Sequence, residues 1–79
     1  MSKSLDKFHD ELNELEELLL PLYSDHEELF EYLDSVNSSR DVHEKMISIN
    51  KIQKYCESQS NVIDRDILNR VDHLKDLLR

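Results

Sequence analysis

Apolar residues recur along this chain in steps of three and four, and this spacing limits what the chain can fold into. From Leu5 to Val36 the alternation is unbroken, and His26 is the one polar member of the series. The members are Leu5, Phe8, Leu12, Leu15, Leu19, Leu22, His26, Leu29, Leu33 and Val36. Such spacing places them on one side of an α-helix, at the a and d positions of a heptad repeat. No stretch alternates apolar and polar residues with a period of two, so we predict an all-α fold.

A second series with the same alternation follows the polar residues 37–41. Its members are Val42, Met46, Ile49, Gln53, Cys56, Ser60, Ile63, Ile67, Arg70, Leu74 and Leu77. Further apolar residues, such as Leu18 and Val71, lie beside the two series and widen the apolar stripes. Wide stripes need cover from more than one side. They predict a small antiparallel helical bundle or a helical hairpin with coiled-coil-like packing.

The number of helices depends on two possible breaks. Pro21 lacks an amide hydrogen, and its ring clashes with the carbonyl of Glu17 in a continuous helix. The following Ser24-Asp25-His26-Glu27 matches a capping box, which favours a new helix from Ser24. The second polar break, residues 57–61, offers Ser60 or Asn61 as an N-cap. We therefore expect helices over 4–20, 24–37, 40–57 and 61–78. The alternative has two long helices, kinked at Pro21 and near Ser60, because the heptad phase continues through both breaks.

The length of 79 residues allows a single domain, residues 1–79, with a small core. The chain has one cysteine, Cys56, so it cannot form an internal disulfide. A lone thiol fits an intracellular (cytoplasmic or nuclear) location. We find no apolar stretch long enough for a signal peptide or a membrane span. Partner chains are then the expected source of extra stability.

The net charge of −8 lies entirely in the first half of the chain. Residues 1–40 hold 11 acidic and 3 basic residues, whereas residues 41–79 hold 7 of each. Nucleic-acid and anionic-membrane binding normally need a basic surface, so we expect neither. The acidic cluster in the first helix is usually a solvated face. It could instead be an acidic docking face for a basic partner, formed by Glu14, Glu16 and Glu17.

No combination of residues predicts a catalytic, cofactor or metal site. The four histidines, His9, His26, His43 and His73, lack the repeated one-turn spacing of helical metal sites. We expect them at the surface, including His26, which would occupy the first turn of a helix that begins at Ser24. Cys56 has no activating base beside it, so we expect a buried thiol. The absence of glycine excludes glycine-rich phosphate loops. We therefore expect that the protein is not an enzyme.

The leading hypothesis is a helical protein–protein interaction module, adaptor or assembly subunit. Its apolar faces would form a homo-oligomer or join other helical proteins in a multi-subunit complex. The residues expected in the interface or core are Leu12, Leu15, Leu19, Leu22, Ile49, Ile67, Val71 and Leu74. The alternative is an acidic inhibitor or nucleic-acid mimic that occupies a basic site on a DNA-binding protein or enzyme.

Overall fold

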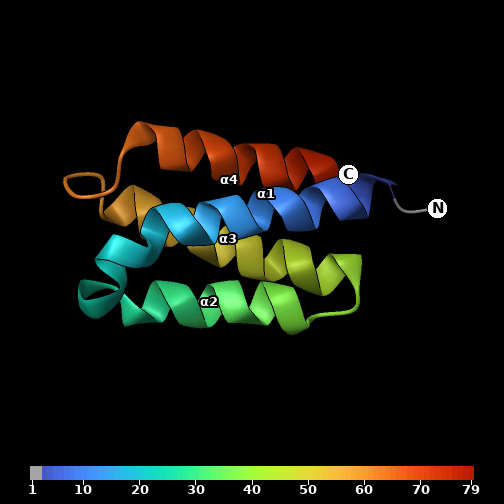
Figure 1. Ribbon diagram of the computed structural model, residues 1–79, viewed down its shortest axis with the longest axis horizontal. Helices are drawn as coiled ribbons and strands as arrows, with labels where there is room; N and C mark the ends of the chain where they lie inside the picture. Colours follow the sequence, from blue (N-terminus) through green and yellow to red (C-terminus); the bar gives the residue numbers. More distant parts are fainter. Residues whose placement is uncertain (1–2) are drawn as a thin grey trace.

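Within residues 3–79, four α-helices run alternately up and down in chain order (Figure 1). The computed structural model describes residues 3–79, with side chains from Leu5 onward. The elements are α1 (Lys3–Leu19), the 3-10 helix η1 (Leu20–Asp25), α2 (Glu27–Ser38), α3 (Val42–Ser58) and α4 (Arg65–Leu78). Residues 3–79 contain no strand. The predictions of an all-α fold and of four helical segments are confirmed, and the two-helix alternative is wrong.

Pro21 determines how α1 ends. The α-helix stops at Leu19, and the chain tightens into η1 with the proline in its first turn. A proline is tolerated there because the first amides of a helix have no partner within it. Ser24 consequently lies inside η1, and α2 begins only at Glu27 with no side-chain cap. The predicted capping box at Ser24 is therefore wrong, since the short 3-10 helix occupies its position.

The starts of α3 and α4 differ in how they are capped. Asp41 precedes α3, and its carboxylate accepts a hydrogen bond from the amide of His43 at 3.2 Å. The predicted start of α4 at Asn61 is four residues too early. Residues 59–63 form a turn in which the amides of Val62 and Ile63 both bond to the carbonyl of Gln59. Ile63, at the end of this turn, is buried in the core, and Asp64 then leads into α4 in an extended conformation.

The core lies along the axis of the bundle. α1 packs mainly on α4, α4 on α3, and α3 on α2, while α1 and α2 make the least contact of these neighbours. Every member of the first apolar series is buried or half-buried. The buried hydrophobic side chains are Phe8, Leu12, Leu15, Leu19, Leu29, Leu33, Val36, Ile49, Ile52, Cys56, Ile63, Ile67, Val71, Leu74 and Leu78. The apolar stripes of the sequence therefore cover one another within a single chain.

The second series is only partly correct. It predicts Val42 and Ser60 on the inner side, but both are exposed, whereas Ile52 and Val71 outside the series are buried. The buried stripe of α3 is rotated away from the predicted heptad positions because this helix packs against both α2 and α4. The heptad phase also cannot pass through residues 59–64, which are not α-helical. Continuous spacing in the sequence therefore does not mark a continuous face.

Lys45 is a buried polar residue that the apolar pattern does not predict. Its ammonium group donates hydrogen bonds to the carbonyls of Val36, at 2.9 Å, and Ser39. These carbonyls lie at the C-terminal end of α2, where a positive charge is favourable. Burial lowers the pKa of Lys45 from its ordinary value. The side chain thus ties the start of α3 to the end of α2.

Truncating a core leucine should destabilise the protein far more than truncating an exposed one. We expect Leu15→Ala to lower the free energy of unfolding by about 2–5 kcal/mol because it leaves a cavity. The matched control is Leu20→Ala, at a side chain that is 57% exposed, and it should change the value by less than about 1 kcal/mol. Urea denaturation followed by circular dichroism measures both. Equal effects of the two substitutions would contradict the assigned core.

Removing the Lys45 charge should weaken the junction between α2 and α3. Lys45→Met keeps the aliphatic stem but leaves two carbonyls without their donor, which should cost about 1–3 kcal/mol of unfolding free energy. Lys51→Met, at an exposed position of the same helix, is the control and should have little effect. Hydrogen exchange should show faster opening at the end of α2 in the first variant only. Unchanged exchange there would rule out the capping role.

Candidate interaction surfaces

The residues predicted for an interface or core lie inside the bundle. Leu12, Leu15, Leu19, Ile49, Ile67, Val71 and Leu74 are buried, and Leu22 is half-buried. They are covered by helices of the same chain, so an assembly through these residues would require the bundle to open. A surface that binds another protein must therefore be built from other side chains.

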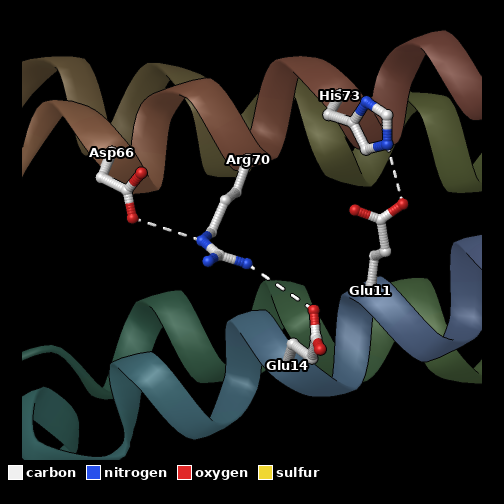
Figure 2. Close-up of polar contacts among 5 residues, drawn as sticks. All are labelled: Glu11, Glu14, Asp66, Arg70 and His73. Atoms are coloured by element: carbon white, nitrogen blue, oxygen red, sulfur yellow. Dashed lines mark hydrogen bonds and ion pairs between the residues drawn. The ribbon is translucent and has the colours of Figure 1, made fainter.

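The three glutamates predicted as an acidic docking face lie on two different flanks of α1. Glu14 points toward α4, where it pairs with Arg70 (Figure 2). Glu16 lies on the opposite flank and accepts a hydrogen bond from the Asn37 amide of α2 at 2.7 Å. Glu17 lines the same groove as Glu14. The three carboxylates are not brought together, and their role in partner binding stays a prediction.

The flank between α1 and α4 is occupied by contacts within the chain (Figure 2). The Arg70 guanidinium lies 3.3 Å from Asp66 and 3.7 Å from Glu14, and His73 Nε2 lies 2.7 Å from Glu11. A groove of about 290 Å³ beside them is lined by Glu14, Glu17, Leu18 and Arg70. Arg70 is the one basic residue among these four lining residues, and it already contacts Glu14 and Asp66. Pairs this exposed contribute about 0–1 kcal/mol each, so they align the helices more than they stabilise them.

A second and larger groove follows η1 and α2. It has a volume of about 490 Å³ and is lined by Tyr23, Phe30, Glu27, Glu31 and Asp34. The rings of Tyr23 and Phe30 meet edge to face, with centroids 4.8 Å apart. Phe30 is half-buried against the core, while Tyr23 is 50% exposed. We name the five lining residues the η1–α2 groove.

Leu20 is a second exposed apolar side chain of η1, at the end of η1 that follows α1. A 3-10 helix has three residues per turn, so Leu20 lies on the same side of η1 as Tyr23. Both side chains are at least half-exposed, at 57% and 50%. Single exposed apolar residues are ordinary, but adjacent ones on one surface mark interaction sites. We name these two residues and Phe30, whose ring contacts Tyr23 in the groove, the apolar strip.

The acidic groups of the η1–α2 groove lack internal partners. Glu27, Glu31 and Asp34 make no ion pair or side-chain hydrogen bond with any residue whose side chain the structure describes. α2 itself carries four acidic residues and no basic one. The carboxylates of this groove therefore have no basic partner among the described side chains, whereas Glu14 and Glu11 contact Arg70 and His73 between α1 and α4.

His26 is buried, contrary to the expectation of a surface position. It precedes α2, and its Nδ1 atom lies 2.6 Å from the hydroxyl of Tyr55 in α3. Burial and the nearby Glu28 raise the pKa of Tyr55, so this hydroxyl stays protonated. The heptad series places His26 correctly, because it occupies a core position despite being polar. The error came from the capping box, which would have set it in an exposed first turn.

Cys56 lies in the core, as its position in the second series predicts. Burial, with a smaller effect of Glu57, raises the pKa of its thiol to about 11. A thiolate is therefore disfavoured here. The thiol packs as a small apolar group in the folded protein.

Residues 3–79 contain neither a metal-binding cluster nor a membrane-spanning helix. No three His, Cys, Asp or Glu residues in that range lie close enough together to hold a metal ion. In the same range, no helix is both long enough and apolar enough to cross a membrane.

Sequence reasoning did not identify the η1–α2 groove. Tyr23 and Phe30 fall outside the heptad series, and only the structure shows that they meet. A signal was present in the spacing of Glu27, Glu31 and Asp34, which is that of one helical face. The expected capping box instead assigned Glu27 to the Ser24 amide. Comparisons with protein families, with curated proteins and with solved structures found no match to this chain.

The buried thiol predicts how stability changes at alkaline pH. The raised pKa of Cys56 means that the folded chain holds a proton that the unfolded chain releases from about pH 9. The protonated thiol contributes its full stabilisation below pH 9. As pH rises toward 11 this contribution is lost, which lowers the free energy of unfolding by up to roughly 2–3 kcal/mol. Urea titrations at pH 8, 9, 10 and 11 should show a steeper decline for wild type than for Cys56→Ala. Parallel declines would show that the thiol does not contribute.

Proposed function

We propose that this protein is a non-enzymatic protein–protein interaction module that acts as an adaptor or as a subunit of a larger assembly. Its binding surface is the apolar strip of Leu20, Tyr23 and Phe30 together with the η1–α2 groove. The heptad side chains build the scaffold that holds this surface in place. The proposal thus keeps the function expected from the sequence but moves the interface from the buried series to the outside of the bundle.

The supporting observation is the contrast between the two flanks of α1. On the α4 side, Glu14 contacts Arg70 and Glu11 contacts His73. On the η1–α2 side, large apolar groups are exposed and the neighbouring carboxylates have no partner among the described side chains. An exposed apolar patch with a polar rim is typical of a surface that another protein covers.

The partner surface would supply apolar side chains for Leu20 and Tyr23. It would also supply polar or basic groups for the rim, because burying an unpaired carboxylate is costly. A location inside the cell is part of the proposal, supported by the single thiol and the lack of a disulfide. Nucleic acid is not the proposed partner, since this flank is negative.

The second candidate is an acidic inhibitor or nucleic-acid mimic. The unpaired carboxylates of α2 favour it, because they would face a basic site. The two candidates differ in which forces dominate binding. A mimic would bind through charge alone and lose most of its affinity in high salt. An interaction module would keep, in high salt, the part of its affinity that comes from Leu20 and Tyr23.

A photo-crosslinking residue in place of Leu20 should capture the partner. With benzoylphenylalanine at position 20, we expect a discrete covalent adduct in living cells of the source organism, detected by gel shift and mass spectrometry. The matched control carries the same residue in place of Lys54, which is exposed on α3. The control should give no such adduct. If both positions give the same products, or neither gives any, the proposed surface is wrong.

A further inference from the structure

The η1–α2 groove combines two features that select one kind of chemical group. The first is an aromatic pair in which the Tyr23 ring is 50% exposed. The second is a row of carboxylates along the neighbouring side of α2. We propose that this groove receives an arginine side chain from a segment of the partner protein. This inference rests on the proposed function and names the chemistry of the partner at the same surface.

The aromatic pair supplies a flat surface for the guanidinium group. Aromatic ring faces carry negative potential and attract cations placed within about 6 Å. The edge-to-face contact of Tyr23 with Phe30, with an interplanar angle of 62°, fixes the orientation of the exposed ring. Phe30 is itself anchored against the core. The ring surface is therefore held in place before any partner binds.

The carboxylates provide the opposite charge at spaced positions. Glu27, Glu31 and Asp34 follow one another at steps of four and three residues, so they span about 10 Å along α2. The helix dipole favours Glu27 in the first turn, but it does not favour Asp34. Like charges at these steps repel one another. A bound cation would relieve this repulsion, which no basic residue of α2 does.

Arginine fits this groove better than the other cations. Its planar guanidinium stacks on aromatic rings and donates to two carboxylate oxygens at once, and it is less strongly hydrated than an ammonium. A metal ion would need a tighter group of ligands, and none occurs in the part of the chain described. The volume of about 490 Å³ is sufficient for one arginine and its flanking backbone.

Three short peptides test the inference on the whole protein. Acetylated and amidated tetra-arginine, tetra-lysine and tetra-citrulline are titrated into isotope-labelled protein and followed by NMR. We expect shifts concentrated in residues 20–34, tetra-arginine affinity about threefold or more above tetra-lysine, and no binding of tetra-citrulline. Equal binding of the arginine and lysine peptides, or shifts spread over all helices, would overturn the assignment.

Matched variants distinguish the contribution of the groove to peptide affinity from that of the overall charge of the protein. Glu31→Gln with Asp34→Asn should lower the tetra-arginine affinity about tenfold, whereas Glu44→Gln with Glu57→Gln, which removes the same charge from exposed positions of α3, should lower it less than twofold. Tyr23→Leu should abolish the preference for arginine over lysine. Equal losses in both double variants would overturn the inference, and so would an unchanged preference in Tyr23→Leu.

The outcome is independent of the cross-linking test of the proposed function. If the Leu20 adduct forms but the arginine peptide does not bind in the groove, the interaction module stands and the arginine inference falls. If the peptide binds as expected but position 20 captures nothing, the cation site stands and the proposed function falls.

Discussion

Pro21 forces the apolar series of the first half of the chain to fold back on itself. Without an amide hydrogen and with a ring that clashes with the preceding turn, it cannot continue α1. η1 turns the chain, and α2 returns antiparallel to α1 (Figure 1). The residues before and after the turn then face one common core. The rest of the bundle depends on this reversal. α1 and α2 make little contact with each other, so α4 covers the apolar side of α1 and α3 covers that of α2.

The same reversal determines what is left on the surface. The six residues of η1 are too few to bury all their side chains, and none of them is buried. Leu20 and Tyr23 are exposed at the turn, and α2 begins directly beyond it with an acidic first turn. Apolar and negatively charged groups are therefore neighbours at this corner. On the opposite flank of α1, Glu14 contacts Arg70 of α4 and Glu11 contacts His73 of α4.

Buried polar groups connect the helices where apolar contact alone would leave them loose. Lys45 donates to the last carbonyls of α2, and His26 contacts the Tyr55 hydroxyl across to α3. Both interactions join α2 to α3, the pair with the most extensive contact. A sequence pattern of apolar residues cannot predict Lys45 in the core, because its burial depends on carbonyl groups that only the adjacent helix end supplies. His26 was predictable from its place in the series, but a competing local signal, the capping box, pointed to the surface.

Heptad spacing is a local property of each helix, so residue spacing alone predicts the all-α class and most of the core, and with Pro21 it favours four segments over two. The same spacing predicts that Cys56 lies in the core, and the residue is buried. The rotation of each helix about its axis depends instead on packing between segments, since α3 packs on two neighbours and its buried stripe lies between them. Tertiary packing likewise decided that the apolar series is internal and that Tyr23 meets Phe30. Those outcomes depend on how separate segments are placed in space, which no local pattern encodes.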